Sequence, residues 1–256
     1  MNSYQFETGI PAPQGLYDFE QERDACGVGL VADLKNEPSH KIIEMGITVL
    51  KRLMHRGAVG SDPDTGDGAG ILLALPDEFF RLVLPNKLPA RGKYGVAMMF
   101  GGCGHEEELE AAVTENGGSV IAWRQVPVDR DSIGKNAQRT CPLIRQLFID
   151  GSGFADQAEF ERKLFVMRRE MERRVEGCYV CSCSSRSIVY KGLFLGTQIE
   201  GFYGDLASEH FKSPLALVHQ RYSTNTFPTW SLAHPFRYLA HNGEINTLRG
   251  NLNHLS

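Results

Sequence analysis

Apolar residues along this chain recur with two spacings, one typical of helices and one typical of strands. From Ser39 to His55 they recur every three or four positions, so they would share one face of a helix. A longer, highly charged segment from Asp156 to Val175 shows the same spacing. The apolar stripes of these two predicted helices are Ile43, Ile47, Leu50 and Met54 in the first, and Phe160, Leu164 and Met167 or Met171 in the second.

Short apolar runs between turn-forming residues predict strands that alternate with the helices. A further helix is expected at about Glu106 to Glu115, and Gly57 to Gly70 reads as a loop rich in glycine and aspartate. We find no internal repeat, low-complexity tract or linker, so the pattern favours one α+β domain. The expected strands are Cys26–Leu34, Ile71–Leu75, Tyr94–Phe100, Ser119–Trp123, Leu143–Ile149, Tyr179–Ser184, Ser187–Tyr190, Leu215–Tyr222 and Phe236–His241.

Composition agrees with a globular chain that has a sizeable core. Of the 256 residues, 42% are hydrophobic and 23% are charged, which excludes disorder for most of the length. The formal net charge of -4 argues against a nucleic-acid partner. No apolar run approaches the ~18 residues of a membrane-spanning helix, so no membrane partner is expected.

The first 25 residues differ from the rest. They hold five acids and a single base, Arg23, so they match neither a secretory signal nor a mitochondrial transit peptide. A short acidic leader of this kind is either a disordered tail or a removable propeptide. Without an export signal, the expected location is the cytoplasm.

Six cysteines would lie in a reducing compartment, where disulfides are rare. Three of them form a Cys-x-x-Cys-x-Cys cluster, at Cys178, Cys181 and Cys183. On a strand, the period of two would place Cys181 and Cys183 on one face and Cys178 on the other. No second ligand pair at zinc-like spacing follows, so we interpret these as buried structural thiols and expect no metal. A thiol-based metal-binding protein stays an alternative.

Two segments carry candidate chemistry. The first is Cys26-Gly27-Val28-Gly29, at the start of the first predicted strand. The second comprises His219 to Thr224, His234-Pro235-Phe236 and His241 to Asn246. Taken singly, a cysteine that opens an apolar strand is typical of a core, and Asn-Gly is typical of a turn. The three histidines are expected to hold loops through ring hydrogen bonds.

Taken together, these segments resemble the glutamine amidotransferase domain of the class II, N-terminal-nucleophile type, most closely that of glutamate synthase large subunits. The similarity extends over Cys26 to Asn251, and it implies the four-layer αββα sandwich of N-terminal-nucleophile hydrolases. Further segments that carry it are Leu53-Met54-His55-Arg56-Gly57, Asp67-Gly68-Ala69-Gly70-Ile71, Ala122-Trp123-Arg124-Gln125-Val126-Pro127-Val128, Ser184-Ser185-Arg186 and Tyr190-Lys191-Gly192.

The resemblance implies hydrolysis of L-glutamine to L-glutamate and ammonia, with Cys26 as the nucleophile and its own α-amino group as the base. Such a pair suits the task, because an α-amine has a pKa of roughly 7.7–8.0 and a free thiol a pKa of about 8.5. A proton can therefore pass between them at little cost in free energy. While Ala25 is attached, that nitrogen is an amide and cannot act as a base. Residues 1–25 are therefore expected to be an acidic propeptide, removed by self-cleavage before Cys26, and residues 26–256 the amidotransferase domain.

Other site residues follow from the same resemblance. The side-chain N–H of Asn242 and the backbone N–H of Gly243 would stabilise the oxyanion of the tetrahedral intermediate. Arg221 would bind the α-carboxylate of glutamine through its fork of donors, and Thr224 is a weaker candidate for substrate contact.

Arg56 and Asp67 lie on segments that line this pocket in the family, where we assign them a supporting role. No cofactor is expected in this chain. The resemblance places FMN and an iron–sulfur cluster in the synthase region, and it makes glutamine, the remaining synthase domains and a reductase subunit the expected partners.

The domain is expected to be incomplete at its C-terminus, because relatives continue past the Asn-Gly motif. In them, an aspartate beyond that motif holds the α-amino group of the substrate. A non-catalytic truncated remnant that acts as a binding or regulatory piece is therefore the alternative function.

Overall fold

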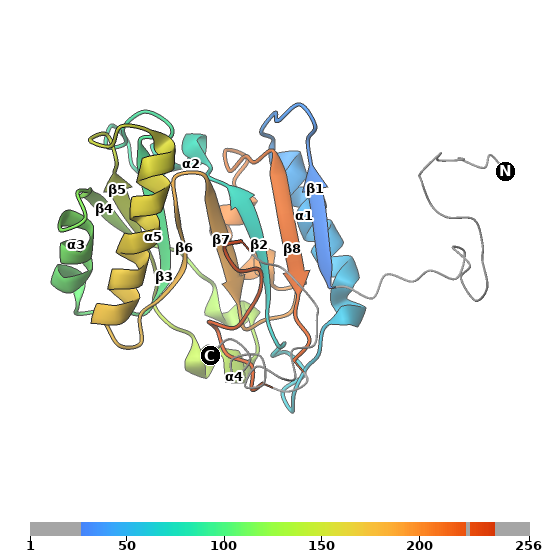
Figure 1. Ribbon diagram of the computed structural model, residues 1–256. Coiled ribbons are helices and arrows are strands. Elements are labelled where there is room, and N and C mark those ends of the chain that lie inside the picture. Colours follow the sequence, from blue (N-terminus) through green and yellow to red (C-terminus); the bar gives the residue numbers. More distant parts are fainter. Residues whose placement is uncertain (1–26, 224–225, 239–256) are drawn as a thin grey trace, which may run out of the picture.

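The computed structural model describes residues 27–223 and 226–238, which form two four-stranded antiparallel sheets (Figure 1). In spatial order, the first sheet consists of β1 (Val28–Ala32), β8 (Leu215–Gln220), β2 (Ala69–Ala74) and β7 (Ser187–Gly192). The second consists of β4 (Ser119–Gln125), β5 (Ile144–Asp150), β3 (Tyr94–Phe100) and β6 (Tyr179–Ser184).

Helices cover both sheets (Figure 1). Helix α1 (His40–Arg52) packs on the first sheet, where Gly46 lies against Ala216, Ile71 and Val218. Within the described residues, no helix combines the length and the apolar character needed to cross a membrane. The second sheet carries α3 (Glu106–Thr114) and α5 (Gln157–Arg174), and shorter helices are α2 (Asp77–Val83), α4 (Lys135–Thr140) and α6 (Ile199–Phe202).

Two hydrophobic cores hold these layers together. The larger one joins residues of both sheets, among them Ile71, Tyr190 and Phe148, with the apolar face of α1. The smaller one lies between the second sheet and the helices α3 and α5. The β6–β7 hairpin connects the two sheets. This arrangement confirms the predicted α+β sandwich of two antiparallel sheets with helices (Figure 1).

The predicted strand at Phe236–His241 is wrong for its described part. Residues 236–238 form no strand, and residues 239–241 lie outside the described residues. Side-chain contacts fix this segment instead of a backbone ladder. The Phe236 ring packs against His234 and Lys191, and the Arg237 guanidinium donates to the Val180 carbonyl oxygen at 2.7 Å.

The three clustered cysteines are buried, as predicted, but their faces are not those predicted. Cys181 belongs to the core that both sheets share, whereas Cys178 and Cys183 belong to the core beneath α3 and α5. The cause is a bulge in β6. Opposite β3, Met98 pairs with Ser182 and Met99 with Val180, so Cys181 is the additional residue and the alternation restarts after it.

A buried ion pair ties β4 to the segment after α6. Both guanidinium ends of Arg124 donate to the Asp205 carboxylate, at 2.8 and 2.6 Å, and the Tyr190 hydroxyl donates to the same carboxylate at 2.8 Å. Asp205 is only 3% exposed. The Asp205 carboxylate is therefore stabilised by Arg124 and Tyr190 in place of water.

Replacing Arg124 by methionine is expected to lower the free energy of unfolding by about 3–5 kcal/mol, because the carboxylate is left buried without its cation. Urea denaturation measures this loss. The control is Lys51→Met, which removes an exposed ion pair to Glu200 and should change stability by about 0–1 kcal/mol. Equal effects of the two substitutions would contradict this interpretation of the Arg124 pair.

Candidate functional site

Several of the predicted motifs meet at one end of the first sheet. The end of β8 pairs with the start of β2, at Gln220 and Ala69. Gly57, which follows the 3₁₀ turn Leu53–Arg56, packs so closely on Gln220 that a Cβ atom would lie 2.4 Å from its side-chain nitrogen. The backbone N–H of Gln220 donates to the Gly27 carbonyl oxygen at 2.8 Å. This corner therefore also includes the residue that follows Cys26 in the sequence.

Arg221 and Asp67 are brought together where β8 ends and β2 begins. The Arg221 backbone N–H donates to the Gly68 carbonyl oxygen at 2.8 Å, and its guanidinium donates to the Asp67 carbonyl oxygen at 3.2 Å. A second guanidinium nitrogen donates to the Thr226 hydroxyl at 2.8 Å. These bonds fix the plane of the guanidinium between the two segments.

The Asp67 carboxylate has a different partner, the backbone N–H of Ser223, which donates to it at 2.6 Å. Asp67 is 7% exposed and Arg221 is 8% exposed. Burial raises the pKa of Asp67, and the Ser223 N–H and the nearby Arg221 cation partly offset this effect. Burial likewise lowers the pKa of Arg221, against the attraction of Asp67. The two buried charges thus stabilise each other's ionised form.

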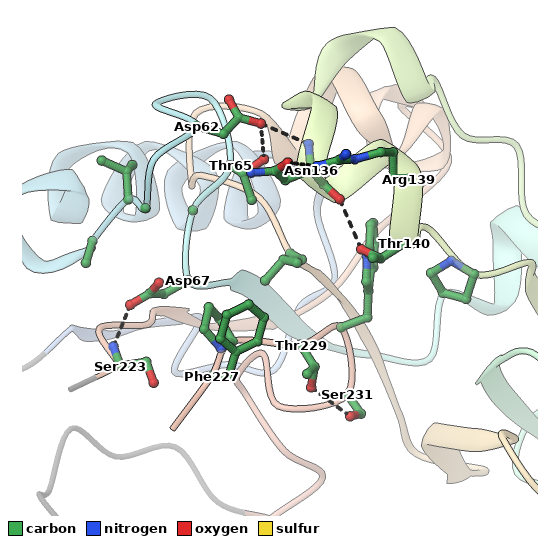
Figure 2. Close-up of a pocket in the computed structure, with 18 of the residues that line it drawn as sticks. Asp62, Thr65, Asp67, Asn136, Arg139, Thr140, Ser223, Phe227, Thr229 and Ser231 are labelled. Carbon is green, nitrogen blue, oxygen red and sulfur yellow. Dashed lines mark hydrogen bonds between the residues drawn. The ribbon is translucent and has the colours of Figure 1, made fainter. Parts of the chain in front are cut away.

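Asp67 and Ser223 line a cavity of about 1080 Å³ (Figure 2). Arg221 is not among the lining residues, and its guanidinium is held against Asp67, which is one of them. The opposite wall comes from α4 and the start of the glycine- and aspartate-rich loop, and aromatic rings close the remainder. Those rings are Phe100, Tyr179, Tyr222, Phe227 and Trp230.

A hydrogen-bonded group stabilises the polar wall of the cavity. The Asp62 carboxylate accepts the backbone N–H of Asn136 at 2.9 Å and the Thr65 hydroxyl at 2.8 Å (Figure 2). These donors, the Asn136 N–H foremost, lower the pKa of Asp62. Nearby, the Trp230 indole N–H donates to the Thr140 hydroxyl at 3.2 Å.

Sequence reasoning missed this wall and the role of Ser223. One signal was present: Asp62 begins an Asp-Pro-Asp-Thr run that favours an Asx turn, and the Asp64 N–H does donate to the Asp62 carboxylate at 3.2 Å. No local pattern could have indicated the contact with Asn136, which lies 74 residues away in the sequence. Ser223 contributes a backbone group, which residue type does not reveal.

The predicted site residues fall into two groups. Cys26, Thr224, Asn242 and Gly243 lie outside the described residues. The structure describes Arg221, Asp67 and Arg56.

Arg56 ends the 3₁₀ turn before Gly57 and is half-buried, and it is not among the residues that line the cavity. No three histidine, cysteine, aspartate or glutamate side chains in the described part of the chain are grouped so that they could hold a metal ion. In the Cys178, Cys181 and Cys183 cluster, burial raises the thiol pKa values to about 11, about 12 and about 12. Such thiols are protonated and therefore poor nucleophiles at neutral pH.

Comparison with known proteins shows which protein family the sequence matches. The sequence model of the family described as class II glutamine amidotransferases matches residues 26–256. The matched region begins at Cys26, the first residue after the acidic leader.

The chain is also similar to part of several curated proteins. It is 50% identical over 256 aligned positions to the glutamate synthase [NADPH] large chain of Bacillus subtilis. The aligned region covers 95% of this chain and 17% of the relative. It is 44% identical to the protein of the same name from Azospirillum brasilense, over 93% of this chain and 17% of the relative. A glutamate synthase [NADH] of Saccharomyces cerevisiae is 43% identical, over 95% of this chain and 12% of that protein. The chain thus spans less than a fifth of the length of these relatives.

Proposed function

Because this chain belongs to the class II glutamine amidotransferases, we propose that it hydrolyses the side-chain amide of L-glutamine, with Cys26 as the nucleophile. The observation that supports this most strongly is the convergence of the family's motifs on one corner. Arg221, Asp67 and the strand that follows Cys26 meet there beside a large cavity.

The reaction has two halves. In the first, the Cys26 sulfur attacks the amide carbon, and the thiol proton passes to the cysteine's α-amino group. The oxyanion that forms accepts hydrogen bonds from Asn242 and Gly243. Collapse of this intermediate breaks the C–N bond, and the leaving nitrogen takes the proton back from the α-ammonium group. Ammonia leaves, and a thioester links Cys26 to the glutamyl group.

In the second half, water attacks the thioester and gives its proton to the α-amino group. The second tetrahedral intermediate expels the thiolate, which is reprotonated, and glutamate is released. The α-amino group must be free for both halves. We therefore assign residues 1–25 as a propeptide that is cleaved before Cys26, and residues 26–256 as the amidotransferase domain.

The ammonia is assigned to a synthase region of a longer protein. The relatives are glutamate synthases several times the length of this chain. Such a region would hold FMN and the iron–sulfur cluster and would use the ammonia with a reductase partner. Amide hydrolysis itself needs no redox group, since no carbon changes its oxidation state.

Incubation of the purified chain with L-glutamine labelled with ¹⁵N in the amide tests this function. We expect labelled ammonia and glutamate in equal amounts, and none above background from L-asparagine, whose amide lies one carbon nearer the α-carbon. Absence of ammonia from glutamine, or equal release from both amides, would overturn the proposal.

We assign the binding of the substrate α-carboxylate to Arg221. Arg221→Lys keeps the charge and loses the planar fork, so it is expected to raise KM for glutamine about ten- to hundredfold, the equivalent of one charge-assisted hydrogen bond. The effect on kcat should be smaller. Steady-state kinetics measure both constants, with the exposed Arg91→Lys as the control. An unchanged KM in a folded Arg221→Lys protein would remove this role from Arg221.

A further inference from the structure

A row of three residues crosses the first sheet on the face opposite α1. Gly70 of β2 pairs with Lys191 of β7 on one side and with His219 of β8 on the other. Directly opposed residues of neighbouring strands point to the same face. The next row, which includes Ile71 and Val218, faces α1. His219 in turn lies opposite Val28 of β1, two residues after Cys26.

The segment Ser231–Phe236 lies on this row, and Lys191 holds one side of it. The Lys191 ammonium donates to the carbonyl oxygens of Ser231 and Ala233, at 2.9 and 2.7 Å, and to the Tyr179 hydroxyl at 2.8 Å. An ammonium group has three donors, so these three acceptors use all of them. The Lys191 nitrogen also lies over the Phe236 ring, 4.5 Å from its centroid.

Because Gly70 has no side chain, the segment Ser231–Phe236 can lie close to the sheet. A Cβ atom on Gly70 would lie 2.5 Å from the His234 carbonyl oxygen and 2.6 Å from the Lys191 Cβ. Neither atom can move away easily, because the carbonyl oxygen belongs to the backbone and the Cβ atom is bonded directly to it. On the far side, the His234 ring stacks on the His219 ring with centroids 4.4 Å apart. The segment is thus held at both ends of the row.

Lys191 is fully buried, and burial lowers its pKa to about 8. Burying an ammonium group is costly, and apolar residues often stabilise a core at least as well. A lysine in this position therefore requires a reason beyond stability. The two segments that meet at this row lead to the proposed site residues, because Asn242 follows Phe236 by six residues and Val28 follows Cys26 by two.

We propose that Lys191 is a positioning residue for the amidotransferase reaction. It holds the Ser231 and Ala233 carbonyl oxygens over the row formed by Lys191, Gly70 and His219. It thereby fixes the segment that leads to Asn242 and Gly243 relative to β1, the strand that follows Cys26. This inference rests on the proposed function and assigns a residue to which that function gave no role.

Two substitutions test it from opposite sides of the contact. Lys191→Met removes the three donors and keeps the chain length, and Gly70→Ala inserts a methyl group where the His234 carbonyl lies. Both should release the segment. Trypsin cleavage of the Arg237–Tyr238 bond, followed by mass spectrometry, measures that release without any activity. We expect cleavage to be faster by about tenfold or more in both variants.

Kinetics then test the link to the reaction. Misplaced oxyanion donors lower kcat, so Lys191→Met is expected to reduce kcat about 10²–10³-fold while KM changes less than about threefold. The controls are the exposed Lys41→Met, and Gly204→Ala, where an added Cβ atom meets nothing within 4 Å. Neither should change the cleavage or the kinetics.

Two outcomes overturn the inference. One is cleavage at the parent rate in both variants. The other is a fall in melting temperature with kcat per folded molecule unchanged, since that would make Lys191 structural only. If Lys191→Met does not fold, Gly70→Ala decides between the same outcomes. A parent chain that hydrolyses no glutamine overturns the proposed function and this reaction role together, whereas an active parent with unchanged variants overturns this inference alone.

Discussion

Replacing Cys26 by alanine is expected to abolish glutamine hydrolysis, with a loss in kcat of about 10⁴-fold or more. The reason is chemical: without the sulfur, no thioester forms, and water would have to attack an unactivated amide directly. The fold should be unaffected, because the substitution removes a single sulfur atom and the described residues already form two cores. Ammonia release measures the activity, and thermal unfolding measures the fold.

Two other thiols serve as controls for this substitution. Cys103 is exposed and lies in the loop before α3, so Cys103→Ala should leave both activity and stability unchanged. Cys183 is buried, and Cys183→Ala should lower stability without a comparable loss of activity per folded molecule. Residual activity of Cys26→Ala within about tenfold of the parent would exclude Cys26 as the covalent nucleophile.

Removal of the side chain of Asn242 is expected to have the second largest effect. Asn242→Ala takes away one of the two donors assigned to the oxyanion, and loss of one such donor lowers kcat by about 10²–10³-fold. KM should change little, because the donors act on the charge that develops in the transition state and not on the bound amide. Measuring kcat and KM separately distinguishes this role from substrate binding.

Asn116→Ala is the matched control, since this asparagine follows α3 and its side chain donates to the Ala112 carbonyl oxygen, at the second sheet. It should leave both kinetic constants unchanged. A rise in KM with unchanged kcat in Asn242→Ala would reassign Asn242 to ground-state binding. Unchanged values of both would remove it from the site.

The sequence predicted the elements that have either a strong hydrophobic period or an unbroken apolar run. Tyr94–Phe100 and Tyr179–Ser184 coincide with β3 and β6, and the predicted stripe Phe160, Leu164, Met167 is buried on α5. On α5 the period marks the face that meets the core, whereas β3 was found as an unbroken apolar run whose residues are buried in both cores. The short helices α2, α4 and α6 were missed, because few turns give little periodic signal.

What the sequence could not predict depends on contacts between distant segments. The bulge at Cys181 reverses the face of that cysteine, and only the pairing of β6 with β3 reveals it. The Tyr190-Lys191-Gly192 motif was part of the resemblance, yet the contacts of Lys191 with Ser231 and Ala233 span 40 and 42 residues of sequence. Residue type indicated Arg221 as a carboxylate-binding group, whereas its bond to Asp67, 154 residues away in the sequence, comes from the meeting of β8 with β2.

The central claim is that Cys26 acts as an N-terminal nucleophile toward glutamine. Labelling with 6-diazo-5-oxo-L-norleucine tests it directly, because this compound carries a diazoketone in place of the glutamine amide and alkylates an attacking thiolate with loss of N₂. Peptide mass spectrometry then locates the adduct. The account predicts one adduct per chain, on the sulfur of a peptide whose first residue is Cys26 with a free α-amino group, and its suppression by excess L-glutamine. An adduct on Cys103 or Cys141, or one on Cys26 while Ala25 is still attached, would contradict it.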